Sequence, residues 1–197
     1  MIFLTIFKLL KNLKWGVIQL NQICDYQTDR IALSSIEPMN YISTENLLPN
    51  CEGRTFYEGT PAEETVIGFK KGDILVSNIR PYLQKIWLAD CDGGCNPDVL
   101  VIRVKDTRLF SPKFVYYALR RKMFFDHMMQ GKSGVKMPRG NKTNNLRFEI
   151  PNIGWNEQHE ILNHVEKMEV GIQNALSLMN SCEGKKRDIV NKYIFER

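Results

Sequence analysis

The sequence predicts an α+β fold, in which a mixed domain with a mostly antiparallel, twisted sheet and flanking helices precedes a long C-terminal helix of coiled-coil type. Short apolar runs separated by glycine and proline turns recur over residues 41–104 and predict the strands. Residues 111–119 have the pattern of a flanking helix. From about residue 156 onward, apolar side chains recur at helical spacing, which predicts the final helix.

The chain of 197 residues divides into three zones. Residues 1–14 are expected to form a short amphipathic helix, residues 15–153 the mixed domain, and residues 154–197 the long helix. The apolar positions of the first zone fall on one helical face: Ile2, Ile6, Leu9 and Leu13. Its apolar stretch is too short for a membrane span, and its lysines follow that stretch, so we expect neither a span nor a signal peptide.

The clearest strand of the mixed domain is Asp73–Ile79, which the Lys71–Gly72 turn introduces. Further strands are expected at Tyr41–Thr44, Lys85–Ala89 and Val99–Val104, with turns at Gly93–Gly94 and Asn96–Pro97. Two segments are less regular. Trp15–Tyr26 fits a strand or a helix, and Pro49–Glu64 is expected to be a loop or a loose hairpin.

A helix is expected to begin after Ser111, whose side chain suits the capping position, with Pro112 in its first turn. Its buried face is expected to carry Phe114, Val115, Ala118 and Leu119. The polar stretch Gly131–Asn145 then predicts a basic loop, and Leu146–Ile150 returns to an extended pattern.

The final helix has the strongest periodicity in the chain. Its apolar seam is spaced alternately by four and three residues, as in a coiled coil, and only Lys186 interrupts it. The seam residues expected to pair are Ile161, Val165, Met168, Ile172, Ala175, Met179, Ile189 and Tyr193, with Cys182 also on the seam. At ~1.5 Å per residue the helix is longer than a small domain can cover. We therefore expect a partner helix, which is the N-terminal helix, a second copy of the chain, or another subunit.

Basic residues are concentrated in one part of the chain. Residues 103–147 hold twelve Lys and Arg against Asp106 and Asp126, a net charge of +10, whereas the whole chain carries +5. Such asymmetry is typical of a phosphate-binding face, although a solvated lysine-rich surface gives the same count.

Two segments combine basic side chains with side chains that hydrogen-bond base edges. In the basic loop the candidate DNA contacts are Lys132, Ser133, Lys136, Arg139, Asn141, Lys142 and Asn144. At the end of the clearest strand they are Ser77, Asn78, Arg80, Tyr82 and Lys85. In the simpler interpretation Ser77 and Asn78 only satisfy backbone groups of a turn.

Motifs of catalysis and of cofactor binding are missing from the sequence. It contains neither a Gly-x-Gly-x-x-Gly loop nor a P-loop. The five cysteines are scattered and odd in number, as expected of reduced thiols in a cytosolic protein. Cys91 and Cys95 could supply two zinc ligands, but no second pair follows at usable spacing, so we expect no metal and no cofactor. Asp90, Asp92 and Asp98 fit ordinary turn chemistry.

Several segments follow one another in a characteristic order: Lys14–Leu20, Tyr41–Leu47, Lys71–Lys85 (KGDILVSNIRPYLQK), Ser111–Leu119, and Gly131–Pro151 followed by Glu157-Gln158-x-x-Ile161. Taken in this order, they resemble the target-recognition domain of a type I restriction–modification specificity subunit. The family's usual member has two recognition domains and two spacer helices, whereas this chain has one of each. It also departs from the family in Ile150–Trp155, where a Pro-rich turn is usual.

The resemblance implies a non-catalytic subunit that reads one half of a bipartite DNA site and docks methyltransferase subunits and the restriction subunit. A half-length chain would form a homodimer or pair with another half-subunit. One alternative is a truncated assembly protein that binds partner subunits without specific DNA binding. Another, the recognition half of a self-contained methylating nuclease, is disfavoured because the chain has no catalytic motif.

Overall fold

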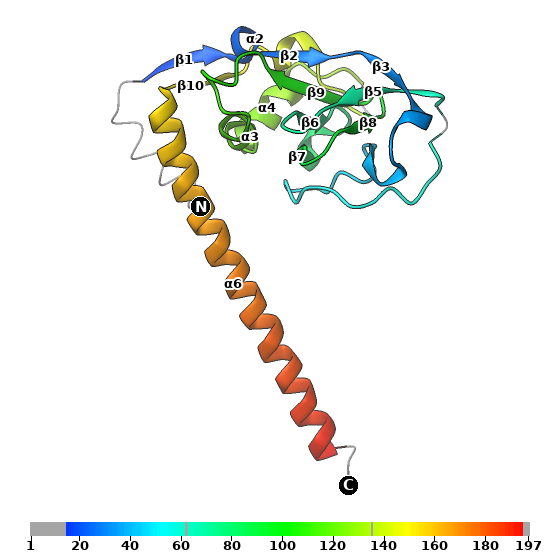
Figure 1. Ribbon diagram of the computed structural model, residues 1–197, viewed down its shortest axis with the longest axis vertical. Coiled ribbons are helices and arrows are strands. Elements are labelled where there is room, and N and C mark those ends of the chain that lie inside the picture. The colour runs from blue at the N-terminus through cyan, green and yellow to red at the C-terminus, as the bar shows by residue number, and fades with distance from the viewer. Residues whose placement is uncertain (1–14, 62, 135, 195–197) are drawn as a thin grey trace. The chain divides into compact units, whose positions relative to one another are not determined.

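The computed structural model describes residues 15–61, 63–134 and 136–194. These form two compact units, the first ending at Gln158 and the second beginning at His159 (Figure 1). The helix expected over residues 1–14 lies outside the described residues. Within the described ranges, no helix is both long and apolar enough to cross a membrane.

The first unit is built on short strands in three sheets. The first sheet has the order β2 (Cys24–Gln27), β9 (Val99–Val104), β6 (Ile74–Ser77), β7 (Ile86–Leu88). The second has the order β3 (Arg30–Ala32), β5 (Thr65–Phe69), β8 (Gly93–Cys95), β4 (Tyr41–Ile42). The third pairs β1 (Gly16–Gln19) with β10 (Glu149–Asn152). Among these strands only β4 and β8 pair in parallel, so the prediction of a mostly antiparallel α+β fold is confirmed.

The described helices are α2 (Leu20–Ile23), α3 (Pro112–Leu119), α4 (Lys122–Gln130), α5 (Lys142–Asn145) and α6 (Trp155–Ile194). Three 3-10 turns add η1 (Leu33–Ser35), η2 (Pro38–Asn40) and η3 (Pro81–Leu83). The ambiguous segment Trp15–Tyr26 contains both structures, because α2 is a single helical turn between β1 and β2. The long C-terminal helix is present as predicted, with 40 residues.

Gly93 and Gly94 do not form the predicted turn but lie in β8, an inner strand that pairs with both β4 and β5. The residues need to be glycine because the strand is crowded. A Cβ on Gly93 would lie 2.6 Å from Cζ of Phe69 and would also clash with the carbonyl oxygen of Asn40. A Cβ on Gly94 would clash with the side chain of Val66. The close approach of neighbouring elements, which local sequence does not reveal, explains this pair.

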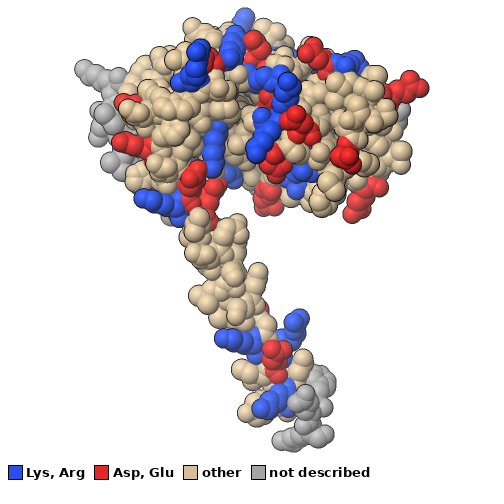
Figure 2. Space-filling model, viewed as in Figure 1, with Lys and Arg blue, Asp and Glu red and all other residues tan. Residues whose placement is uncertain are grey.

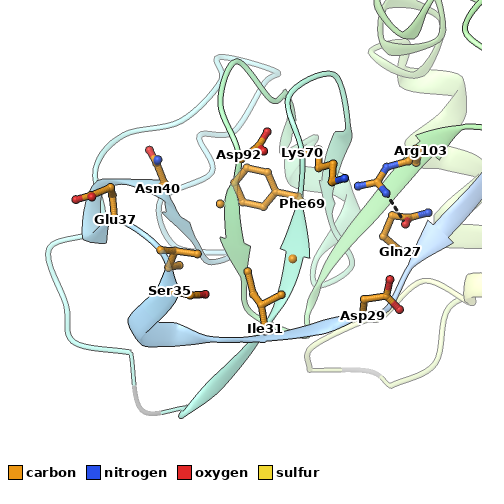
Figure 3. Close-up of a pocket in the computed structure, with 13 residues that line it drawn as sticks. Gln27, Asp29, Ile31, Ser35, Glu37, Asn40, Phe69, Lys70, Asp92 and Arg103 are labelled. Carbon is orange, nitrogen blue, oxygen red and sulfur yellow. Dashed lines mark hydrogen bonds between the residues drawn. The ribbon is translucent and has the colours of Figure 1, made fainter.

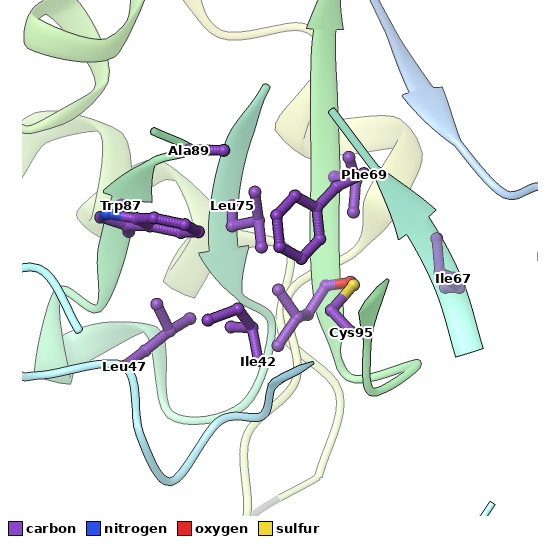
Figure 4. Close-up of a cluster of buried hydrophobic side chains, with 10 residues drawn as sticks. Ile42, Leu47, Ile67, Phe69, Leu75, Trp87, Ala89 and Cys95 are labelled. Carbon is purple, nitrogen blue, oxygen red and sulfur yellow. The ribbon is translucent and has the colours of Figure 1, made fainter. Parts of the chain in front are cut away.

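A compact apolar cluster joins the first two sheets (Figure 4). Phe69 of β5 and Trp87 of β7 meet edge to face with ring centroids 5.8 Å apart. Leu75, at the centre of β6, is fully buried beside them. The remaining members are Ile42, Leu47, Ile67, Ala89, Cys95, Val99 and Val101. Alternating apolar positions of several strands therefore supply one core, which packs the two sheets together.

A buried ion pair fixes one end of the first sheet. Asp73 precedes β6, and its side chain is only 3% exposed. Arg103 on β9 donates to both carboxylate oxygens of Asp73, with Nε–Oδ1 and NH2–Oδ2 distances of 2.7 and 2.6 Å, and its NH1 donates to Gln27. A fork of this kind is the strongest geometry available to an arginine–carboxylate pair. Arg103 is therefore a structural cation.

The start of α3 differs in one detail from the prediction. Ser111 occupies the capping position, but its side chain makes no capping hydrogen bond. Instead, Oε1 of the fully buried Gln158 accepts from the backbone N–H of Ser111 at 2.9 Å, while its Nε2 donates to the carbonyl oxygens of Leu109 and Ile153. The predicted buried face of α3 is confirmed: Phe114, Val115, Ala118 and Leu119 are all buried.

We expect Gly93→Ala to lower the free energy of unfolding by about 1–3 kcal/mol, because the added methyl group overpacks a site closed by backbone. Urea denaturation measures the change. Gly16→Ala is the matched control, since a Cβ on Gly16 of β1 meets no atom within 4 Å. Equal stability of the two variants would contradict the role given to Gly93.

Candidate nucleic-acid interface

The two segments that the sequence singled out as DNA contacts lie side by side. The backbone N–H of Arg80 donates to the carbonyl oxygen of Pro138 at 2.8 Å, and that of Gly140 donates to Asn78 at 3.1 Å. Ile79 and Arg139 form an antiparallel bridge between these bonds. The end of β6 and the loop after α4 therefore form one surface, although some 60 residues of sequence separate them.

The loop after α4 is held as a tight hairpin. Ser133 and Arg139 exchange two backbone hydrogen bonds, each of 2.9 Å. Gly134 has a φ of 82°, in the left-handed region that glycine adopts without strain. The basic side chains of Lys132, Lys136 and Arg139 are exposed on this hairpin. The sequence predicted the loop and its charge but not the hairpin, which the backbone bonds between Ser133 and Arg139 close.

The segment after β6 holds an unusual backbone geometry. Arg80 and Gln84, on either side of η3, have φ values of 50° and 53°. A non-glycine residue in this region costs of order 1–3 kcal/mol and is found preferentially at functional sites. Backbone hydrogen bonds from Asn50 to Leu83 and from Cys51 to Gln84 stabilise the segment. Local sequence could not indicate these bonds, because their donors lie about thirty residues earlier in the chain.

Eight of the twelve predicted contact residues are exposed: Arg80, Tyr82, Lys132, Ser133, Lys136, Arg139, Asn141 and Lys142. Among the residues that the structure describes, the side chains of Arg80, Lys132, Lys136 and Lys142 have neither a hydrogen bond nor an ion pair. The NH2 group of Arg139 donates to Oδ2 of Asp98 at 3.0 Å. Exposed guanidinium and ammonium groups on one surface have the chemistry that phosphates and guanine edges require.

The other predicted contacts have structural partners or are buried. The hydroxyl of buried Ser77 donates to the carbonyl oxygen of Ile79 at 3.0 Å, as the simpler interpretation of this residue expects. Lys85 is half-buried and its Nζ donates to Thr44 at 2.5 Å; burial lowers the pKa of this lysine. Asn144 donates to the carbonyl oxygen of His127. Exposed Asn141 also caps α5, because its Oδ1 accepts from the backbone N–H of Asn144.

Two asparagines, Asn78 and Asn145, are buried beneath the loop, and the sequence identified only Asn78 as a candidate contact. Asn78 is 6% exposed and Asn145 only 1%. Within the described part of the chain, Oδ1 of Asn78 and both side-chain polar atoms of Asn145 have no hydrogen-bond partner. A Cβ on Gly140 would lie 2.9 Å from Asn78 Oδ1 and 3.0 Å from Asn145 Nδ2, so both amides lie close to Gly140. The sequence identified Asn78 and missed Asn145, which is hidden at the end of α5.

The basic tract over residues 103–147 is not one continuous face. Several of its cations are bound by groups of the first unit: Arg103 by Asp73, Lys105 by Asp25, Arg108 by Asp106, Lys122 by Asp126, and Arg120 by Cys51 and two tyrosine rings. Figure 2 accordingly shows blue and red side chains intermixed over the first unit. Within the described part of this tract, exposed cations without such a partner remain at Lys132, Lys136, Lys142 and Arg147.

A pocket of about 460 Å³ lies at the opposite end of the first sheet (Figure 3). Phe69 and Ile31 form apolar walls, and Asp29 and Lys70 add charge at the rim. Arg103 borders it but is held by Asp73 and Gln27. Since Arg103 follows Ile102, which pairs with Ile74, whereas Asp98 precedes Val99, which pairs with Ser77, the pocket and the candidate interface lie at opposite ends of the strands.

The cysteines of the first unit have the environment of packing residues. Burial raises the pKa of Cys24 and of Cys95 to about 12, so both thiols stay protonated at neutral pH. Cys91 is half-buried, and its Sγ donates to Oδ1 of Asn40. Among the described residues, no three His, Cys, Asp or Glu side chains are grouped as metal ligands.

In the second unit, the predicted seam of α6 is largely exposed. Val165 is buried and Ile161 half-buried, whereas Met168, Ile172, Met179, Ile189 and Tyr193 are between 40 and 71% exposed and Ala175 is also exposed. Residues 170–182 contain no charged side chain, and the middle of this helix is tan in Figure 2. Exposed apolar side chains on an uncharged helical segment are typical of a surface that binds another protein.

No family model matches the sequence. A search of curated proteins finds the specificity subunit of the type I restriction enzyme EcoDI from Escherichia coli, with 29% identity over 183 aligned residues. The alignment covers 85% of this chain and 39% of that subunit. This chain therefore spans less than half the length of the curated relative that it matches.

Solved structures with the same fold come from type I restriction–modification systems. The HsdS subunit from Thermoanaerobacter tengcongensis has a TM-score of 0.69 and 18% identity, covering 91% of this chain and 48% of that one. The S subunit from M. genitalium has a TM-score of 0.60 and 20% identity, covering 92% and 46%. A chain from a study of type I system assembly and conformational transition has a TM-score of 0.67 and 20% identity, covering 92% and 49%.

We expect Gln84→Gly to raise the free energy of unfolding by roughly 0.5–1 kcal/mol, because glycine adopts the left-handed backbone without the steric cost of a side chain. Gln130→Gly, the same replacement at the end of α4, is expected to lower it by up to about 1 kcal/mol. Urea denaturation of both variants gives the two signs. A loss of stability in Gln84→Gly would show that this backbone is not strained.

Proposed function

We propose that this chain, which resembles one half of a type I specificity subunit in sequence and in fold, binds duplex DNA and reads one half of a bipartite site. The observation that carries the proposal is the joining of the Arg80 segment to the Arg139 hairpin. It brings two exposed guanidinium groups and the lysines of the hairpin onto one rigid support. Arginine forks read guanine edges, and the lysines would hold phosphates.

The exposed seam of α6 supports a second part of the proposal, the pairing of two chains. Residues 155–169 contain four glutamates and one lysine, whereas residues 183–194 contain four basic and two acidic side chains. Antiparallel pairing of two copies would place the acidic part of each helix against the basic part of the other, and parallel pairing would place like charges together. We therefore infer an antiparallel homodimer, centred near Ala175.

A two-fold dimer of this kind would read a palindromic site whose centre is not contacted, because the symmetry of the protein is mirrored in its site. It would restore the two recognition domains and two helices of a full-length specificity subunit. In the proposed complex, methyltransferase subunits and the restriction subunit supply the catalysis in the cytoplasm, and this chain contributes recognition alone. Pairing with another half-subunit would serve the same purpose.

One observation fits a second candidate function equally well. The uncharged, exposed segment 170–182 would also suit an assembly protein that binds partner subunits without reading DNA. The salt dependence of binding separates the two functions. Each phosphate contact that a DNA-binding chain neutralises steepens the fall of affinity with salt, whereas an assembly protein would have no such DNA affinity.

The test uses duplexes that the wild-type chain enriches from a random library. We expect Arg80→Ala and Arg139→Ala each to lower the affinity for these duplexes about 10-fold or more, because each removes a bidentate donor of about 1–3 kcal/mol. Fluorescence anisotropy at moderate salt measures the affinity. Arg108→Ala is the control, since Arg108 is an exposed cation in the loop after β9, at the other end of the sheet. Unchanged affinity in both variants would refute the contact assignment.

We expect Ile172→Asp to convert the dimer to a monomer, because it places a charge in the apolar seam close to its centre. Light scattering coupled to gel filtration gives the mass. Asn174→Asp adds the same charge two residues along, on the opposite side of the helix, and should leave the dimer intact.

Oxidative cross-linking tests the direction of pairing. In an antiparallel pair the two alternating classes of seam position face each other, so an Ile172→Cys variant is expected to form a disulfide with native Cys182 of the other copy when Ala175 lies opposite Met179. In a parallel pair, Cys182 would instead cross-link to Cys182 in the wild-type chain. A wild-type disulfide dimer at this position would therefore contradict the antiparallel arrangement.

A further inference from the structure

We propose that Asp98 is a positioning residue, which holds the Arg139 guanidinium in the orientation that reads a base and thereby sets specificity at the expense of affinity for DNA in general. The inference rests on the proposed DNA-binding function. Asp98 lies in the turn between β8 and β9 and was not among the predicted contacts. At the sequence level it is one of three aspartates attributed to turn chemistry.

The contact between the two side chains leaves most of the arginine available. NH2 of Arg139 donates to Oδ2 of Asp98 at 3.0 Å. Among the residues that the structure describes, no acceptor bonds to Nε or NH1 of Arg139. The Arg139 side chain is 53% exposed and that of Asp98 33%, so the pair lies at the surface with donors still open to solvent. A guanidinium has five N–H donors, enough to hold one carboxylate oxygen and a guanine edge together.

Asp98 is itself rigidly anchored. Its backbone N–H donates to Oδ1 of Asn96 at 2.8 Å, and its carbonyl oxygen accepts from the N–H of Asn78 at the same distance. Nδ2 of Asn96 donates to Glu63, and the N–H of Asn96 donates to Ile42. The main chain that carries the carboxylate is therefore held by hydrogen bonds to three neighbouring segments, so the starting point of the Asp98 side chain is fixed.

The backbone of Arg139 is fixed by different bonds, those to Ser133 and the bridge to Ile79. Only the long side chain remains free to change rotamer, and the ion pair with Asp98 restrains it. Immobilising such a side chain on binding costs about 0.5–1.5 kcal/mol, so a side chain held in place beforehand binds with a smaller entropic cost. Supporting groups of this kind are what a precise recognition site requires.

The charge of Asp98 argues against a role in simple phosphate binding. A carboxylate beside the exposed cations of the hairpin repels phosphates and lowers the affinity of this surface for every duplex. Its position is advantageous only if orienting Arg139 matters more than the total positive charge. A purely structural ion pair would instead stabilise the hairpin and have no effect on base preference.

The test compares affinities for a duplex enriched by the wild-type chain and for a duplex of scrambled sequence. Asp98→Asn is expected to raise affinity for the scrambled duplex by up to about 3-fold at low salt, through the lost repulsion. It is expected to reduce the ratio of the two affinities by about 2- to 10-fold, through the lost restraint on Arg139. Asp25→Asn is the matched control, because it neutralises another aspartate that pairs with a basic residue, Lys105. It should leave the ratio unchanged.

A second variant tests whether Asp98 acts through Arg139. Arg139→Lys retains the positive charge but lacks the fork, so it should reduce the ratio while leaving binding to the scrambled duplex nearly unchanged. In the double variant that combines Asp98→Asn with Arg139→Lys, the two reductions of the affinity ratio should not add, because Asp98 acts through Arg139. Additive losses, or an Asp98→Asn variant with an unchanged ratio, would overturn the role of Asp98. A wild-type chain that binds both duplexes equally would overturn the proposed function itself.

Discussion

The candidate interface depends on a few main-chain hydrogen bonds between the end of β6 and the loop after α4. The bonds from Arg80 to Pro138 and from Gly140 to Asn78 join segments that are far apart in the sequence. Without them the arginines of the two segments would lie on independent loops. With them, both are carried by one support, which the apolar cluster around Leu75 holds in place. Backbone bonds, unlike side-chain contacts, leave the functional groups free for a ligand.

The two ends of the first sheet use charge in opposite ways. At the Asp73 end, Arg103 forms a bidentate ion pair with a buried carboxylate and so stabilises the fold. At the Asp98 end, a single and exposed contact leaves Arg139 with open donors. The physical difference is burial. A charged group removed from water must be fully paired, whereas an exposed one can leave some of its donors to water or a ligand. A count of basic residues over 103–147 includes both kinds and overstates the charge that a ligand meets.

The second unit has an exposed apolar surface on α6, which no other described residue of the chain covers. Most of the α6 seam from Met168 onward is exposed, and the surrounding segment has no charge to solvate it. The acidic and basic ends of the helix add direction to this surface. The exposed cations of the candidate interface and the exposed apolar seam thus lie in separate units, so a substitution in one unit leaves the residues of the other unchanged.

By itself the sequence determined the features that depend on neighbouring residues. Its local patterns predicted the strand Val99–Val104, the buried face of α3, the full length of α6 and the two segments that carry Arg80 and Arg139. Only the tertiary structure decided that Gly93 and Gly94 form an inner strand, that Gln158 takes the backbone N–H at the start of α3, and that Asp98 faces Arg139. The reason is physical. Periodicity and turn propensity act over a few residues, whereas steric crowding, burial and the choice of a charge partner are set by groups that meet only when the chain has folded.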